Sequence, residues 1–247
     1  MNADNSSSMP RIAKKRACYS RRQGSSSAAS RSADTTEGIL LALAQAVEQR
    51  DARTSGHCAR MAFISVSLGI AMGLQQTCLL SLYRGGYLHD VGKVGIPDSI
   101  LFKPGDLTDE EWVVMRSHAA RGEEICRHLH VLSPVLPIIR HHHERWDGSG
   151  YPDGLRGSQI PLLARIVQTA DIYDALTSVR PYKPALQPEQ ALRVLQEETD
   201  RGWRDPEIVK LFVRLQPAVL SKAEEYTALS NRSLQALQTY VGTSVLN

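Results

Sequence analysis

Residues 85–97, GGYLHDVGKVGIP, place His89 beside Asp90 at the end of an apolar run, and Lys93 follows three positions later. Imidazole and carboxylate groups are metal ligands, and burying them among glycine and aliphatic residues costs free energy unless they find partners. We therefore expect the fold to bring further polar groups to this stretch.

The neighbouring segments have the periodicity of helices. A helix predicted over residues 54–72 carries His57 on the face formed by Met61, Ile64 and Leu68. The next helix runs into the quoted stretch. An apolar helix face points toward the core, so His57 is expected to be buried.

A further helix has a clear start signal. Thr108 and Glu111 form a predicted capping box in PGDLTDEEW, and the helix that they open carries His118 on the side of Met115. This helix therefore brings another imidazole toward the core.

The stretch LSPVLPIIRHHHERW, residues 132–146, predicts a helix that ends in three histidines. Ser133 is the expected cap and Pro134 the first helical residue, and His142 follows on the apolar face. His141 is expected to be an exposed polar residue at the helix end.

The C-terminal half begins with an irregular stretch. Residues 147–161, DGSGYPDGLRGSQIP, are too rich in glycine and turn dipeptides for regular structure, so we expect an ordered loop. A helix from Pro161 carries Asp171, and more helices are predicted over residues 188–200, 205–215 and 221–240. No strand alternation is visible, so the predicted class is all-α.

The chain of 247 residues is 42% hydrophobic, which is enough for one sizeable core. Residues 1–36 hold seven lysines and arginines against two aspartates, so we expect a disordered, basic, serine-rich leader. A single helical domain is expected over residues 37–216, with a C-terminal helical extension over residues 217–247. Thr36 would cap the first helix of this domain, and Leu40, Leu43 and Val47 would form its apolar stripe.

Several classes of protein are not indicated. No run of about 18 apolar residues occurs, and no apolar segment follows the N-terminal basic residues, so neither a membrane span nor a secretory signal is expected. The predicted location is the cytoplasm. The basic leader lacks interleaved aromatic residues, so no specific nucleic-acid partner is predicted. The oligomeric state is left open.

Seven side chains from the predicted helices are candidate metal ligands: His57, His89, Asp90, His118, His142, His143 and Asp171. Buried without a cation, they would leave many unpaired polar groups, each costing about 1 to 3 kcal/mol. Two divalent cations would satisfy them at once. A nitrogen and oxygen ligand set suits iron or manganese first, and zinc, nickel and magnesium stay open.

A pair of cations has a defined chemistry. Two ions about 3.5 to 4 Å apart acidify a shared water and polarise a phosphoryl group, which is the chemistry of phosphoester hydrolysis. Asp90 can bridge such a pair. Lys93 is placed to neutralise charge in the transition state.

Three stretches occur in order: LHDVGKVGIPDSILFKPGDLTDEEW, HHERWDGSGYP and ADIYDALTSVRPYK. Together they resemble the HD-GYP domain, a subgroup of the HD metal-dependent phosphohydrolases that cleaves bacterial cyclic di-GMP. The resemblance covers roughly residues 37–215. An HD pair alone fits many nucleotide hydrolases, whereas the added HHERWDGSGYP is specific.

The resemblance implies a helical bundle of the HD phosphohydrolase type with the glycine-rich loop beside a metal centre. It places the seven candidates at the ligand positions of the family, with Asp90 as the bridge and Asp90 and Lys93 as catalytic residues. It also implies that Lys93, Arg180 and Lys183 hold the substrate.

The resemblance further implies a partner and a metal number. In the family, the loop that contains Gly150, Tyr151 and Pro152 is implicated in contacts with diguanylate cyclase (GGDEF) domains. Members with a third metal carry a glutamate four residues before the first ligand histidine. Arg53 takes that place here, so two metals are expected.

Three functions are compatible with these residues. The leading one is a phosphodiesterase that hydrolyses cyclic di-GMP to pGpG, to GMP or to both. The second is a phosphohydrolase of another cyclic dinucleotide. The third is a signalling module that binds nucleotide or a cyclase domain without turnover, and the intact ligand set argues against it.

Overall fold

The computed structural model describes residues 28–50, 56–178, 184–228 and 233–244, and every regular element in these ranges is helical. This confirms the predicted all-α class. The α-helices are α1 (Ala28–Arg50), α2 (His57–Ala71), α3 (Gln76–Leu88), α4 (Asp98–Leu101), α5 (Asp109–Arg116), α6 (His118–Cys126), α7 (Leu136–His141), α8 (Leu162–Thr177), α9 (Pro188–Asp200), α10 (Pro206–Thr227) and α11 (Leu234–Ser244). Short 3-10 helices are η2 (Val91–Gly95), η3 (His130–Leu132) and η4 (Gly157–Gln159).

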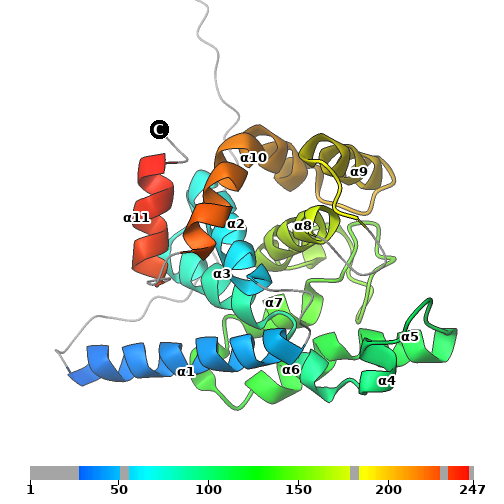
Figure 1. Cartoon of the computed structure of the whole chain (residues 1–247), viewed down its shortest axis with the longest axis horizontal. Helices are drawn as coiled ribbons and strands as arrows, with labels where there is room; N and C mark the ends of the chain where they lie inside the picture. The colour runs from blue at the N-terminus through cyan, green and yellow to red at the C-terminus, as the bar shows by residue number, and fades with distance from the viewer. Residues whose placement is uncertain (1–27, 51–55, 179–183, 229–232, 245–247) are drawn as a thin grey trace, which may run out of the picture.

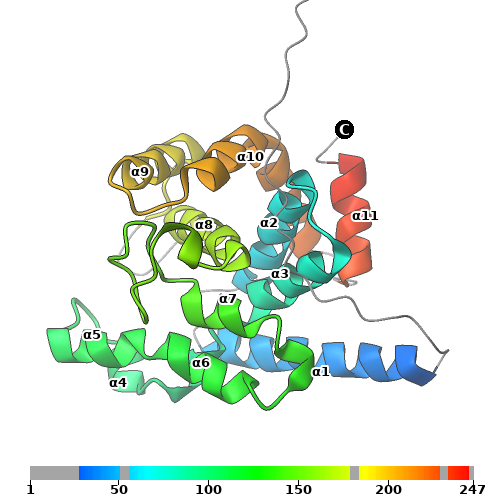
Figure 2. The same cartoon turned by 180° about the vertical axis from the view of Figure 1, so that it is seen from behind.

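The helices are arranged in layers around α2 (Figure 1). Helices α1, α4, α5 and α6 lie along one edge, α9 and α10 along the opposite edge, and α2, α3, α7 and α8 between them; Figure 2 shows the same order from behind. Helix α2 is buried almost all round and packs against α3, α8 and α10. A side chain at Gly86 would overlap the backbone of Ala62, so this glycine allows α3 to pack closely on α2.

A second close approach forms the site. A side chain at Gly92 in η2 would overlap the carbonyl oxygen of His118, so only glycine lets the start of α6 pack directly on η2. This contact brings His118 to Asp90.

Helix α1 differs from the prediction. It begins at Ala28, so nine residues of the segment expected to be a disordered leader, 28–36, belong to this helix. Leu40 and Ala44 are buried, whereas Leu43 is 44% exposed, so the predicted stripe was wrong at Leu43. Ala44, one turn after Leu40, takes that place on the buried face of α1.

The helix predicted over residues 205–215 is longer than expected. Helix α10 continues through Pro217 to Thr227, although proline removes one helical hydrogen bond. The burial of Val219 and Tyr226 in the common core stabilises this continuation. Residues after 216 therefore pack against the same core, and α11 packs on α2 in place of the predicted helix over 221–240.

Two helix starts complete the comparison with the prediction. The capping box of Thr108 and Glu111 is confirmed, but the helix that it opens ends at Arg116, and α6 begins anew at His118. Helix α7 begins at Leu136 with Pro137 in its first turn, so Ser133 is not its cap. Within the described ranges, no helix combines the length and apolarity that crossing a membrane requires.

Candidate metal centre

All seven predicted ligand side chains meet at one place in the fold. Six of them lie at helix ends or in the turns that follow, and one lies inside a helix. They are His57 at the start of α2, His89 and Asp90 after α3, His118 at the start of α6, His142 and His143 after α7, and Asp171 in α8.

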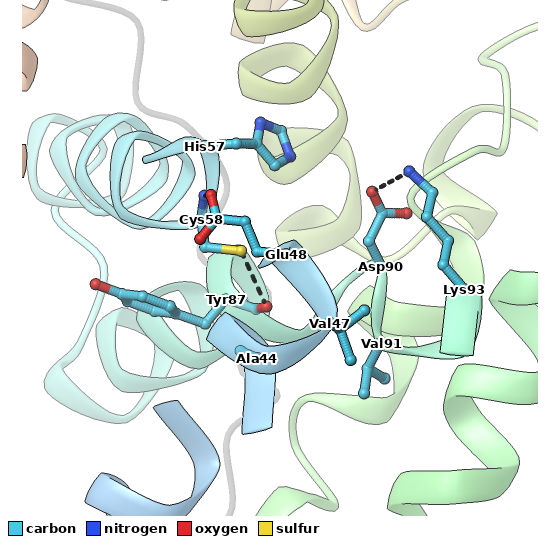
Figure 3. A pocket seen from close by; sticks show the side chains of 9 residues that line it. All are labelled: Ala44, Val47, Glu48, His57, Cys58, Tyr87, Asp90, Val91 and Lys93. Carbon is cyan, nitrogen blue, oxygen red and sulfur yellow. Dashed lines mark hydrogen bonds and ion pairs between the residues drawn. The ribbon is translucent and has the colours of Figure 1, made fainter. Parts of the chain in front are cut away.

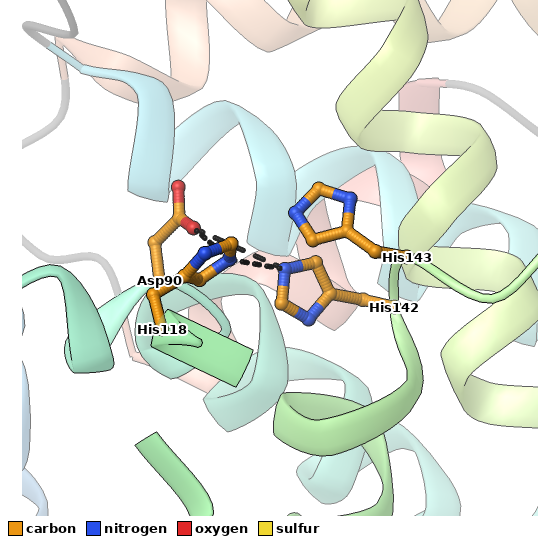
Figure 4. A group of neighbouring side chains, drawn as sticks. All are labelled: Asp90, His118, His142 and His143. Carbon is orange, nitrogen blue, oxygen red and sulfur yellow. Dashed lines mark hydrogen bonds and ion pairs between the residues drawn. The ribbon is translucent and has the colours of Figure 1, made fainter. Parts of the chain in front are cut away.

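One group of donors, the His118 group, consists of Asp90, His118, His142 and His143, and its ligand atoms all lie within 4.8 Å of one another (Figure 4). Nε2 of His118 lies 3.4 Å from Asp90 Oδ1 and 3.4 Å from Nε2 of His142. Ligands held about 2.1 Å from one ion lie about 3 to 3.5 Å apart, so this spacing suits a shared cation.

A second group, the His57 group, consists of His57, His89, Asp90 and Asp171. The Nε2 atoms of His57 and His89 are 3.4 Å apart, and His89 Nε2 lies 3.3 Å from Asp90 Oδ2. Oδ1 of Asp171 lies 3.8 Å from His57 Nε2 and 4.0 Å from His89 Nε2. This group offers two imidazoles and two carboxylates.

Asp90 belongs to both groups. Its Oδ1 faces His118 and His142, and its Oδ2 faces His89 and Lys93. Oδ1 is buried and has no hydrogen-bond partner among the described residues. A buried carboxylate oxygen without a hydrogen bond is costly, and a cation beside it would remove that cost. The donor set therefore fits divalent metal ions on either side of Asp90.

Backbone carbonyls orient three of the imidazoles. Nδ1 of His89, His118 and His142 each lies 2.8 to 3.1 Å from a carbonyl oxygen three residues earlier in the chain. A carbonyl oxygen can only accept, so each Nδ1 donates and each Nε2 keeps its lone pair for a ligand.

A carboxylate orients His57 instead. Nδ1 of His57 lies 2.7 Å from Oδ2 of Asp174, and Arg60 Nε donates to Oδ1 of Asp174 at 2.5 Å. A carboxylate behind a ligand histidine fixes its tautomer and increases its basicity. No sequence motif indicated this role for Asp174; the available signal was its place one turn after Asp171 on the same helix.

The protonation states favour metal binding in the His118 group. Burial holds the pKa of His142 and His143 well below the ordinary histidine value and also lowers the pKa of His118. Neutral imidazoles are the ligand form. Burial alone would lower the pKa of His89, but the charge and hydrogen bond of Asp90 raise it overall.

Lys93 reaches the shared carboxylate. Its Nζ lies 2.6 Å from Asp90 Oδ2. Burial would raise the pKa of Asp90, but the charges of Lys93 and His89 outweigh burial. The pKa of Asp90 is therefore well below its usual range. The guanidinium of Arg50, the last residue of α1, donates to the carbonyls of Lys93, Val94 and Ile96 at 2.9 to 3.0 Å. Arg50 thereby caps η2 and fixes the backbone that carries Lys93.

The centre is deeply buried at its histidines and partly exposed at its carboxylates. Helix α1 covers the His57 side, where a cavity of about 30 Å³ separates it from His57, Asp90 and Lys93 (Figure 3). This volume holds water but not a nucleotide. The side chains of Asp90 and Asp171 are 20% and 17% exposed, whereas those of the deepest histidines are fully buried. A large ligand can therefore reach the centre at these two carboxylates.

The loop after α7 lies beside the centre. The Tyr151 ring stacks on His143, with centroids 4.8 Å apart and an interplanar angle of 26°. Tyr151 also lies edge-on to His118, with centroids 6.4 Å apart. The peptide bond between Tyr151 and Pro152 is cis. The Gly150–Pro152 segment therefore contacts the His118 group directly.

Glu144 holds this loop in place. It is fully buried, and its two oxygens accept from the backbone amides of Asp153 at 2.7 Å and Leu155 at 3.0 Å. Gln168 of α8 donates to the carbonyl oxygens of His142 and Glu144. Glu144 therefore positions the loop from within the core.

His141 is not the exposed residue that the sequence predicted. Its side chain is only 15% exposed, and its Nδ1 lies 3.4 Å from Asp153 Oδ2 and 3.8 Å from Glu144 Oε1. The loop folds back over the end of α7 and covers it. His141 thus lies behind the loop rather than at the centre.

Three predicted residues lie outside the described residues: Arg53, Arg180 and Lys183. Their expected roles in metal number and substrate binding stay predictions.

Comparisons with known proteins agree with this geometry. A family model described as HD domain matches residues 42–208. The cyclic di-GMP phosphodiesterase response regulator RpfG of Xanthomonas campestris pv. campestris is 43% identical over 71% of this chain and 47% of its own length. The 3'3'-cGAMP-specific phosphodiesterase 3 of Vibrio cholerae is 37% identical over 80% of this chain and 42% of its own length.

A solved structure has the same fold. The crystal structure of the cyclic GMP-AMP specific phosphodiesterase V-cGAP3 of V. cholerae superposes with a TM-score of 0.60 at 19% identity, covering 82% of this chain and 52% of the other. The chain thus spans about half the length of the curated relatives that it matches.

Proposed function

The chain belongs to the HD domain family, in its HD-GYP subgroup, and we propose that it is a metal-dependent phosphodiesterase that hydrolyses cyclic di-GMP. The observation that carries this proposal is the position of Asp90, whose two oxygens face two separate groups of histidines. A shared carboxylate between two nitrogen-rich groups is the arrangement that a two-metal phosphodiesterase needs.

The residues that would hold the metals are the His118 group on one side and the His57 group on the other. When bound, divalent cations supply Lewis acidity that polarises a phosphodiester and acidifies water. We propose two ions and, from the nitrogen and oxygen donors, iron or manganese as their identity.

Residues of the chain would act on the substrate directly. Lys93 is 26% exposed beside Asp90, so its ammonium group can reach an anionic phosphate at the centre. We propose that Arg180 and Lys183 bind the same substrate. Their segment contains Pro181 and Pro184, which restrict the backbone between and beside the two cations.

The reaction adds one water across a phosphodiester. A P–O bond forms to the water oxygen, the P–O bond to the ribose 3′ oxygen breaks, and that oxygen gains a proton. The product is the linear dinucleotide pGpG, and a second hydrolysis gives two GMP molecules. The cytoplasm, where such a nucleotide signal is made, is the proposed location.

The choice of cyclic dinucleotide has a second candidate. A relative at 37% identity is named as specific for 3'3'-cGAMP, which supports that nucleotide as an alternative substrate. Both nucleotides have two phosphodiesters in one ring and differ in one base. Comparing kcat/KM for the two with the same preparation decides between them.

We also propose that the loop binds a diguanylate cyclase domain. Asp153 and Gly154 are exposed while the neighbouring Tyr151 contacts the centre, so a partner on the loop surface could influence the His118 group. Co-purification of a cyclase domain with the wild-type chain, and its loss on replacing Asp153 and Gly154, would test this contact.

Turnover by metal-loaded protein tests the main proposal. Cyclic di-GMP is incubated with protein loaded with iron or manganese, and pGpG and GMP are quantified. Hydrolysis that is abolished by a chelator supports the proposal. Binding of the nucleotide without turnover under every metal tested would favour the non-catalytic module instead.

A further inference from the structure

We propose that Arg116, at the end of α5, binds the second phosphate of the cyclic dinucleotide, the one that is not being hydrolysed. The inference rests on the proposed function. It assigns a substrate-binding role to a residue that neither the motifs nor the ligand geometry had singled out.

Arg116 is linked to the metal centre through a row of rings. Tyr151 stacks on His143, and the guanidinium carbon of Arg116 lies 5.4 Å from the centroid of the Tyr151 ring. The same carbon lies 5.6 Å from the centroid of the Trp112 ring, one turn earlier in α5. Two cation–π contacts restrict the guanidinium to a position beside Tyr151.

The guanidinium has no acidic partner. Arg116 is exposed, and it forms no ion pair with any described residue, unlike Arg140, which pairs with Glu123 at 2.7 Å and Asp153 at 2.7 Å. Stacking on aromatic faces leaves the in-plane N–H donors of an arginine available. An arginine held in this way is suited to bidentate binding of a phosphate.

The shape of the substrate favours a second cation beside the metal centre. A cyclic dinucleotide carries two phosphodiesters on opposite sides of one ring, so only one can lie at Asp90. The carboxylates of Asp90 and Asp171 are partly exposed, and Tyr151 stacks on the neighbouring His143, so a ligand bound at Asp90 can extend past Tyr151. Lys93 is paired with Asp90 beside the phosphate that is hydrolysed, so the second phosphate is better served by a cation farther along the ring, and Arg116 beside Tyr151 offers one.

Two substrates separate binding of the second phosphate from the chemical step. Bis(4-nitrophenyl) phosphate has a single phosphodiester, so it reports on the metal centre alone. For Arg116→Gln, we expect the ratio of kcat/KM for cyclic di-GMP to that for bis(4-nitrophenyl) phosphate to fall about tenfold or more, mainly through KM. Arg116→Lys keeps the charge without the planar fork, and we expect an intermediate ratio.

The matched control is Arg127→Gln, which removes an exposed arginine directly after α6 that pairs with Glu124. The ratio should stay at the wild-type value in this variant. An unchanged ratio in Arg116→Gln overturns the inference, and so does an equal fall for both substrates, which would mean that Arg116 supports the loop. If wild-type protein cleaves bis(4-nitrophenyl) phosphate but no cyclic dinucleotide, the proposed function itself fails.

Discussion

In both halves of the candidate metal centre, the histidines leave Nε2 available to a ligand, but the contacts that orient their rings differ. In the His118 group, the Nδ1 atoms of His118 and His142 are held by carbonyls three residues earlier in their own segments. In the His57 group, His89 is held in the same way by the carbonyl of Gly86, whereas His57 is held by Asp174, which lies 117 positions away in the chain.

This difference separates local from tertiary control of a ligand. An imidazole held by its own turn keeps its orientation wherever that turn forms. His57 keeps its orientation only while α2 and α8 stay packed together. Asp90 connects the two halves. A substitution at Asp90 should therefore affect both halves, one at Asp174 only the His57 group, and one at Glu144 only the loop beside the centre.

The largest effect is expected at the shared residue. Asp90→Ala removes the carboxylate that faces both groups, so both ions should be lost and hydrolysis of cyclic di-GMP should fall by about a thousandfold or more. Steady-state turnover and metal content of the purified variant measure this. Activity within about tenfold of wild type would contradict the shared role of Asp90.

A smaller effect should be confined to one half. Asp174→Asn removes the charge behind His57, so metal affinity of the His57 group should fall about 10- to 100-fold while the His118 group keeps its ion. Titration with a competing chelator resolves the two affinities. Asp200→Asn, at the end of α9, is the control; equal weakening of both sites in Asp174→Asn would show that the halves are not independent.

A change at Glu144 should destabilise the loop and leave the candidate metal ligands in place. Glu144→Gln removes one of the two acceptors for the buried backbone amides of Asp153 and Leu155. We therefore expect the free energy of unfolding to fall by about 1 to 3 kcal/mol. Denaturant unfolding measures this change. Glu124→Gln removes only an exposed ion pair and should cost less than about 1 kcal/mol. Equal costs would contradict the role of Glu144 in holding the loop.

The smallest expected effect is a difference in pH dependence. Asp90 raises the pKa of His89, whereas burial lowers the pKa of His118, His142 and His143. Protons compete with metal for an imidazole, so as pH falls the His57 group should release its ion first, and the His118 group should keep its ion to lower pH. Metal content measured across a falling pH series checks the order, and release of the His118 ion first would contradict it.

The helical class could be predicted from local periodicity, and the meeting of the seven candidate side chains could be predicted from the cost of burying so many polar groups apart from one another. Helical periodicity places His57 and His118 toward the core, and the turn after each helix carries the remaining histidines. Their role as ligands stays a proposal. Asp174 could not be paired with His57, because no local pattern states which helices pack together.

Other features depended on tertiary packing for the same reason. The sequence around Glu144 resembles an exposed turn, and only the folded loop shows that its carboxylate is buried beneath two amides. The cap that Arg50 forms on η2 requires α1 to lie across the centre. The break at Ser117 and the helix through Pro217 show that packing moves helix boundaries away from local signals.

Anomalous scattering from crystals of fully metal-loaded protein tests the shared role of Asp90 most directly. We expect two ions, one contacted by each carboxylate oxygen of Asp90 at about 2.0 to 2.2 Å, one held also by the His118 group and the other by the His57 group. A single ion, or a third ion bound by protein side chains beside His57, would contradict the two-metal centre.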